Sequence, residues 1–207
     1  MKRLLVLLFL SVPALTFADQ LSEQVLGRMR AAMTQKKGYE AEFSVTAEGM
    51  ENVFGTLKVF GDRYMIKVGE QEQFSDGEFS YGVNGLDKQV VIENLPEGGA
   101  DIFTTPSRAF EFGAELFDMT YEGVFDANGY RCEKIVLKPK ADSFNGINQI
   151  FLYVDRQKSV PRVISYDYNG AVLAVNIDEV EFSDEYDDDD FKFDRGKYFG
   201  YEIMDFR

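Results

Sequence analysis

The chain has 207 residues, a formal net charge of -14, one cysteine and no histidine. This length suits one domain with a sizeable core, and so acidic a surface repels nucleic acid and anionic lipid headgroups. Without histidine, a Ser-His-Asp triad, a Cys-His pair and the common histidine-containing zinc sites are excluded.

Residues 1–18 have the features of a cleaved export signal. Lys2 and Arg3 form a basic start, residues 4–12 are apolar, and Thr16 and Ala18 are small residues at the positions that a signal peptidase recognises. The apolar run is well short of the roughly 20 residues that span a membrane. We expect cleavage after Ala18 and a soluble mature domain over residues 19–207. The alternative is an uncleaved helix at the membrane interface.

Residues 19–37 are predicted to form one amphipathic helix. Asp19 at its start and Gly38 after its end suit the helix dipole and a glycine stop. Apolar residues recur at spacings of three and four. They are Leu21, Val25, Met29 and either Ala32 or Met33. One face of this helix should therefore lie on an apolar surface.

From residue 39 onward, apolar and polar side chains alternate, as in strands buried on one face. Four dipeptides supply the residues that hairpin turns favour: Asp76-Gly77, Asn84-Gly85, Asn128-Gly129 and Asn169-Gly170. The predicted strands are 39–48, 54–59, 63–68, 71–74, 79–83, 88–93, 117–125, 130–138, 147–155, 162–168 and 172–182. Cys132, which cannot form an internal disulfide, should pack in one of them as a small hydrophobic side chain.

The alternation stops between residues 95 and 115, where Pro96, Gly98-Gly99 and Pro106 interrupt it. We expect one or two short helices or a mobile loop here. One sheet of about ten or eleven strands must curl, or it exposes an apolar face. We therefore predict a mainly β fold: an incomplete, unclosed antiparallel barrel with an N-terminal helix and a short helical lid, residues 95–115, on its concave side. A two-sheet sandwich is the alternative.

No local motif specifies catalysis or metal binding. The acidic run 184–190 lacks the spacing of a calcium loop and should be a solvated loop, and no glycine-rich phosphate loop occurs. Carboxylates are so numerous that spacing cannot reveal a catalytic pair. We expect no enzyme, cofactor or metal site. The concave face is instead expected to be partly unfilled and open to an apolar ligand, with an ordinary core as the alternative.

Several short motifs follow one another in a fixed order. They are Phe-Gly-Thr-Leu-Lys-Val at 54–59, Arg63-Tyr64, Phe-Ser-Asp-Gly-Glu-Phe-Ser-Tyr at 74–81, Lys-Gln-Val-Val-Ile at 88–92 and Phe-Lys-Phe-Asp at 191–194. Their order resembles the outer-membrane lipoprotein carrier (LolA-like) family over nearly the whole mature chain. One position departs from it: Gly61 stands where the best-known members have an arginine that holds the lid closed, and Arg63 is the nearest substitute.

The resemblance implies a monomeric periplasmic carrier that holds the acyl chains of lipoproteins in a hydrophobic cavity. Such a carrier accepts acylated lipoproteins from an inner-membrane lipoprotein-releasing transporter and delivers them to an outer-membrane acceptor or to the membrane itself. An envelope adaptor that senses lipids or lipoproteins without transferring them is the alternative. Nucleic acid is not an expected partner.

The strand faces and the lid supply candidate cavity residues, each of which could equally belong to an ordinary core. If residues 95–115 are a movable cover, Ile102→Glu or Phe103→Glu should abolish acyl binding and leave the fold intact. The candidates are Phe43, Val45, Leu57, Val59, Tyr64, Ile66, Phe79, Tyr81, Ile102 and Phe103.

Overall fold

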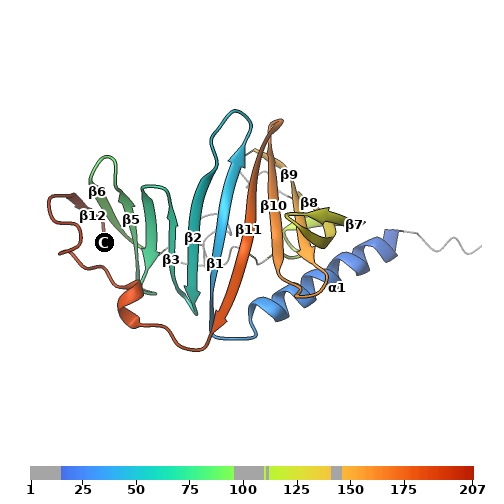
Figure 1. Ribbon diagram of the computed structural model, residues 1–207, viewed down its shortest axis with the longest axis horizontal. Coiled ribbons are helices and arrows are strands. Elements are labelled where there is room, and N and C mark those ends of the chain that lie inside the picture. Colours follow the sequence, from blue (N-terminus) through green and yellow to red (C-terminus); the bar gives the residue numbers. More distant parts are fainter. Residues whose placement is uncertain (1–14, 96–109, 111, 141–145) are drawn as a thin grey trace, which may run out of the picture.

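A computed structural model describes residues 15–95, 110, 112–140 and 146–207 (Figure 1). These residues form one α-helix and a single sheet of twelve strands, in the order β12-β6-β5-β4-β3-β2-β1-β11-β10-β9-β8-β7. The outermost strands, β12 and β7, do not pair with each other, so the sheet remains open. This confirms the predicted unclosed barrel with an N-terminal helix, and the sandwich alternative is wrong.

The strands lie within two residues of their predicted bounds, apart from a twelfth that was not predicted. The elements are α1 (Leu15–Met33), β1 (Gly38–Ala47), β2 (Val53–Phe60), β3 (Arg63–Val68), β4 (Gln71–Ser75), β5 (Phe79–Asn84), β6 (Gln89–Asn94), β7 (Phe117–Ala127), β8 (Tyr130–Pro139), β9 (Ile147–Asp155), β10 (Pro161–Tyr168), β11 (Ala171–Ser183), the 3-10 helix η3 (Asp188–Phe191) and β12 (Glu202–Asp205). All neighbours pair antiparallel except β12, which runs parallel to β6.

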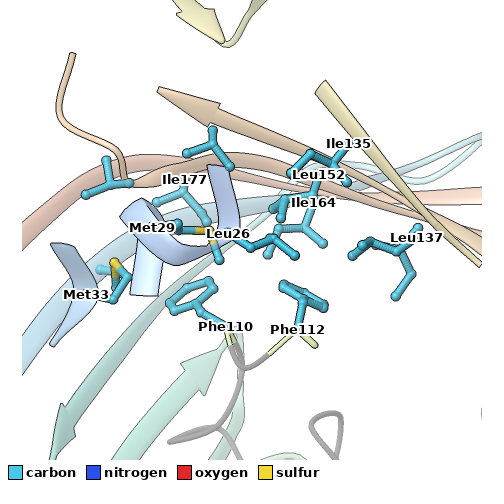
Figure 2. Close-up of a cluster of buried hydrophobic side chains, with 14 of the residues drawn as sticks. Leu26, Met29, Met33, Phe110, Phe112, Ile135, Leu137, Leu152, Ile164 and Ile177 are labelled. Atoms are coloured by element: carbon cyan, nitrogen blue, oxygen red, sulfur yellow. The ribbon is translucent and has the colours of Figure 1, made fainter. Parts of the chain in front are cut away.

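Helix α1 lies on one face of the sheet, hereafter the inner face, beside β7 to β11 (Figures 1 and 2). Its buried stripe is Val25, Leu26, Met29 and Met33. Leu21, which the sequence pattern assigned to this stripe, is 43% exposed. No helix among the described residues has the length and apolar character needed to cross a membrane.

The helix ends four residues before the predicted position. The backbone N–H of Lys37 donates to the carboxylate of Asp184, and the carbonyl of Lys37 accepts from Gly61. These bonds draw the chain onto the sheet, where β1 begins at Gly38. A side chain at Gly38 would clash with the carbonyl oxygen of Val59, so glycine is needed for this close approach of the two strands.

A second hydrophobic cluster lies on the opposite, outer face of β4, β5 and β6. Phe74, Tyr81, Val83, Val90 and Ile92 are buried there beneath the C-terminal segment. The rings of Phe74, Tyr81, Phe193 and Tyr198 stack in a set with centroid separations of 4.9 to 6.4 Å. Residues 184–207 thus follow the outer side of the sheet from β11 to its far edge (Figure 1).

The acidic run at the start of this segment is largely exposed, and two of its aspartates form ion pairs. Asp184 pairs with Lys36, and Asp190 pairs with Lys58 at 3.1 Å. The guanidinium of Arg63 lies 5.1 Å from the ring centres of both Phe60 and Phe191. Arg63 therefore holds η3 against the outer face. Gly61 occupies the β2–β3 turn with φ +60.

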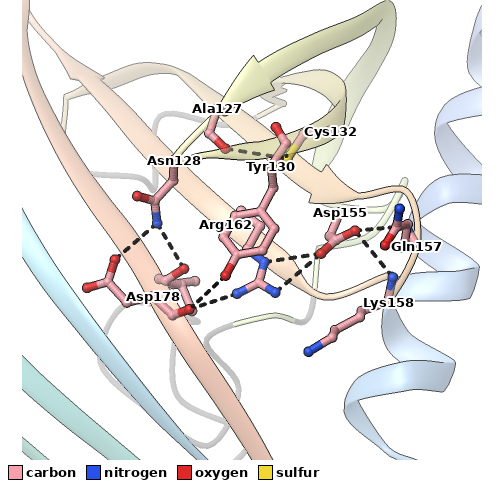
Figure 3. A network of polar contacts seen from close by, with 10 residues as sticks. Ala127, Asn128, Tyr130, Cys132, Asp155, Gln157, Lys158, Arg162 and Asp178 are labelled. Atoms are coloured by element: carbon pink, nitrogen blue, oxygen red, sulfur yellow. Dashed lines mark hydrogen bonds and ion pairs between the residues drawn. The ribbon is translucent and has the colours of Figure 1, made fainter.

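A buried ion pair ties β9, β10 and β11 together (Figure 3). Arg162 donates to the carboxylate of Asp155 at 3.2 and 3.3 Å and to the carbonyl of Asp178 at 2.9 Å. The ring of Tyr130 covers the guanidinium, with 3.5 Å between its centre and the guanidinium carbon. Asp178 forms a β-bulge where β11 pairs with β1. Glu42 pairs with Glu179 and Phe43 pairs with Ile177, so Asp178 has no partner residue on β1. The network therefore fixes the bulge beside Phe43.

Candidate functional site

An apolar cavity with a volume of about 450 Å³ opens on the inner face, beside the core that α1 covers. Its volume falls in the usual range for small-molecule sites. None of the described lining side chains carries a charge, so the cavity suits hydrocarbon and penalises an ion. The lining consists of Ala41, Phe43, Val45, Leu57, Ile66, Val68, Phe110, Ile147, Ile164, Tyr166, Tyr168, Leu173, Val175 and Ile177.

The strand register explains why these side chains meet. Ile177 on β11 pairs with Phe43 on β1, which pairs with Gly55 on β2, which pairs with Val68 on β3. Paired residues point to the same face, so this row lines one wall. At Gly55 a Cβ would lie 2.5 Å from the Phe43 ring and 2.7 Å from the Lys67 carbonyl oxygen. The absent side chain therefore makes room for the Phe43 ring.

The helix side of the cavity is bounded by Phe110. Its ring lies 5.8 Å from that of Tyr39, and Figure 2 shows Phe110 and Phe112 pointing toward Leu26 and Met29. Arg30 of α1 donates to the carbonyl of Phe112 at 3.0 Å. The helix thus anchors the end of the predicted lid that the structure describes. Ile102 and Phe103 lie outside the described residues, and the lid stays a prediction.

The mouth of the cavity lies at the tip of the β10–β11 hairpin. Tyr168 and Leu173 line the cavity and are still 48% and 39% exposed. The neighbouring β1–β2 hairpin, whose tip lies at the same end in Figure 1, presents Met50, which is 67% exposed. Exposed apolar side chains of both hairpins thus lie at this end of the sheet.

Burial affects the pKa of two tyrosines at or near the cavity. It raises the pKa of Tyr166, whose ring lines the cavity. Burial also raises the pKa of Tyr64 in the adjoining core, and a hydrogen bond from the Gln73 amide to its hydroxyl partly offsets this. Since the ordinary pKa of tyrosine is about 10, both phenols stay uncharged near neutral pH.

The structure places four of the predicted residues in the cavity wall: Phe43, Val45, Leu57 and Ile66. Val59 and Tyr64 are buried deeper in the same core. Phe79 and Tyr81 lie on the outer face instead. Met65 points outward because it directly precedes Ile66, which points inward, and successive strand residues point to opposite faces. Met65 pairs with Phe74, and Phe74 pairs with Tyr81, so all three point to the outer face. Alternation had revealed two faces of β5 without indicating which one points inward.

Sequence reasoning missed the half of the wall that β9, β10 and β11 supply. The alternation in residues 172–182 predicts a strand but not which strands lie beside it. Its placement depends on the pairing of β1 with β11, more than 120 residues apart in the sequence. The missed lining residues include Ile164, Tyr166, Val175 and Ile177. Cys132 is fully buried, as expected for a small hydrophobic side chain, and it does not line the cavity.

No known family description and no curated protein matches the sequence. Among solved structures, the chain is similar to an uncharacterised conserved protein from Thermus thermophilus, with 12% identity, a TM-score of 0.62 and coverage of 90% of this chain and 99% of that chain. This likeness supports the fold alone.

Two weaker likenesses have TM-scores below one half. One is to a putative outer membrane lipoprotein-sorting protein domain from Vibrio parahaemolyticus, with a TM-score of 0.47, 9% identity and coverage of 89% and 99%. The other is to a LolA superfamily protein from Nitrosomonas europaea, with a TM-score of 0.41, 9% identity and coverage of 84% and 98%. Both are too distant in shape to bear on function.

Proposed function

We propose that the protein is a periplasmic carrier that binds acyl chains of lipoproteins in this cavity. It takes them from an inner-membrane lipoprotein-releasing transporter and delivers them to the outer membrane. The observation that supports the proposal is the uncharged cavity left open within an otherwise packed core. Interiors are normally close-packed, so a hollow of this size in an apolar wall favours an apolar occupant. The predicted export signal and the motif order agree with this assignment.

The volume sets how much hydrocarbon the cavity can hold. A methylene fills about the same volume as a water molecule, roughly 30 Å³, so 450 Å³ has room for about fifteen methylenes, or one acyl chain. At about 0.8 kcal/mol each, their transfer from water is worth roughly 12 kcal/mol. The remaining chains of a lipoprotein would need additional space, which movement of the predicted lid would provide.

Release needs no input beyond a comparable apolar acceptor. Only the difference between two apolar sites determines where the cargo resides, so a cavity with an exposed mouth suits transfer. Tyr168 and Leu173, which line this mouth, lie where cargo would enter and leave.

The test is displacement of a fluorescent fatty acid by a synthetic tripalmitoylated S-glyceryl-cysteine peptide. The chain contains no tryptophan, so the probe's emission has no tryptophan background. Leu173→Asp places a charge at the mouth, and Val172→Asp is the matched control, since both residues are exposed neighbours pointing to opposite faces. We expect Leu173→Asp to weaken binding about tenfold or more and Val172→Asp to leave it unchanged.

Failure of the lipopeptide to displace the probe would show the proposal to be wrong. The same complex is then mixed with acceptor vesicles. Binding without transfer to vesicles, or to a purified acceptor, would favour the sensing adaptor over the carrier.

A further inference from the structure

A second, polar groove continues the inner face beyond the apolar cavity. It has a volume of about 520 Å³ and is formed by β3, β4, β5 and β6. Ile66 and Val68 line both hollows, so the polar groove adjoins the apolar cavity. An amphiphile whose hydrocarbon fills the first would place its head group at the second.

The register gives the groove a row of carboxamides. Val68 pairs with Gln71, Gln71 with Asn84, and Asn84 with Gln89. Neighbouring strands are about 4.8 Å apart, so this row extends roughly 15 Å from the edge of the apolar cavity. Gln73, one row along, also lines the groove. Each carboxamide offers two donor hydrogens and an acceptor oxygen.

Neighbours hold these amides in place. Gln73 donates to the Tyr64 hydroxyl at 3.3 Å, Asn84 donates to Asp87 at 2.7 Å and accepts from its backbone, and Gln89 donates to Glu202 at 3.4 Å. These contacts use only part of each amide's capacity for hydrogen bonds. Groups fixed in this way lose little freedom when a ligand binds.

The charge of the groove excludes one class of head group. Glu72 is the one charged residue of the described lining, and no lysine or arginine contributes to it. The side chain of Glu72 points to the outer face, where Lys67 pairs with it at 2.9 Å and the hydroxyl of Tyr198 donates to it at 3.1 Å, so neither charge of this pair faces the groove. A phosphate would find no cation here and would be repelled by a chain of net charge -14.

We infer that the polar groove is the head-group subsite of the cargo, and that it selects uncharged hydroxyl and peptide groups over phosphate. This inference rests on the proposed function, because the acyl chain must occupy the adjoining cavity. The lipid-modified N-terminus of a lipoprotein carries such neutral groups, whereas a glycerophospholipid carries a phosphate at the same distance from its acyl chains.

Gly82 provides a direct test. It lines the groove, and a Cβ built there meets no atom within 4 Å, so Gly82→Phe fills the groove without displacing its walls. Gly27→Phe is the matched control, because Gly27 has the same open surroundings on α1 and lines neither hollow. Gln71→Leu, at an exposed position, removes one amide with little change in volume.

Three probes that share one hydrocarbon chain are compared: an N-palmitoyl peptide amide, methyl palmitate and hexadecyl phosphate. For the unmodified protein we expect the peptide amide to bind about tenfold more tightly than the phosphate, the effect of one or two net hydrogen bonds. Gly82→Phe and Gln71→Leu should remove this preference and leave methyl palmitate binding unchanged, and Gly27→Phe should change nothing.

Equal binding of the peptide amide and the phosphate, or a preference that survives Gly82→Phe, would overturn the subsite while leaving the acyl cavity intact. If none of the three probes binds, the proposed function itself fails. Circular dichroism of each variant identifies any loss of fold, in which case the Gln71→Leu result decides the matter.

Discussion

Filling the cavity from within should shorten the acyl chain that it accepts. Val175 lies at the centre of β11, paired with Val45 on one side and Ile164 on the other, and all three line the cavity. Val175→Phe adds four carbon atoms to this wall. Because Val175 is only partly buried by its neighbours, the larger ring can enter the open volume without clashing with the packed core.

The magnitude follows from the volume. If each added carbon displaces about one methylene of the ligand, the variant loses about four of the roughly fifteen that fit, or about 3 kcal/mol, which is roughly a hundredfold in Kd. In the unmodified protein, affinity should rise about fourfold for each added methylene until the chain has about fifteen carbons, and then level off. In Val175→Phe the plateau should begin at about eleven carbons.

The assay is displacement of a fluorescent fatty acid by neutral N-acyl glycinamides of about eight to eighteen carbons, so that each step adds only apolar surface. Ala174→Phe, the adjacent outward-facing position, is the control. A plateau at the same chain length in both proteins, or an equal shift in Ala174→Phe, would refute the claim that this cavity holds the chain.

Three further predictions concern the structure around the site. Arg162→Leu leaves Asp155 as an unpaired buried charge and should lower the free energy of unfolding in urea by about 3–5 kcal/mol, with part of the loss recovered when Asp155→Asn is added; a cost below about 1 kcal/mol would contradict the buried pair. Phe193→Ala removes one ring from the outer stack and should cost about 2 kcal/mol and speed amide hydrogen exchange in β12, without changing acyl affinity. Burial raises the pKa of the Cys132 thiol to about 11, so at pH 8 the folded protein should react with iodoacetamide about a hundredfold more slowly than in urea. Because the fold favours the neutral thiol, burial of Cys132 contributes to the free energy of unfolding below the unfolded pKa of about 8.5, and this contribution declines as pH rises toward 11. Fast alkylation of the folded chain at pH 8 would contradict the burial of this thiol.

Local signals were sufficient for most of the sheet. The strands β3 and β9 have the predicted bounds, because alternation and flanking turn residues define both ends. Asn128-Gly129 and Asn169-Gly170 form the predicted turns, and both residues of each pair have positive φ. Asparagine and glycine tolerate this conformation better than other residues, so the dipeptide alone specified the turn.

Long-range pairing was beyond the reach of the sequence pattern. β12 is four residues long and pairs parallel with β6, which lies more than a hundred residues earlier, so nothing local marks it as a strand. For the same reason, the sequence pattern did not show which face of β5 points inward. It also did not show that β10 and β11 line the cavity. Arg63 shows the same limit for a single residue. It lies two residues from Gly61, where the best-known members of the LolA-like family have the arginine that holds the lid closed. This closeness in sequence did not indicate that Arg63 packs between Phe60 and Phe191.

The central claim is that hydrocarbon from another molecule completes the inner face of the sheet. Nuclear Overhauser effects between the methylene protons of a bound palmitoyl chain and the methyl groups of the protein test it most directly. We predict contacts to Ile66, Ile164 and Val175, which line the cavity. At saturating ligand, the absence of these contacts, or contacts confined to Val90 and Ile92 of the outer cluster, would contradict the account.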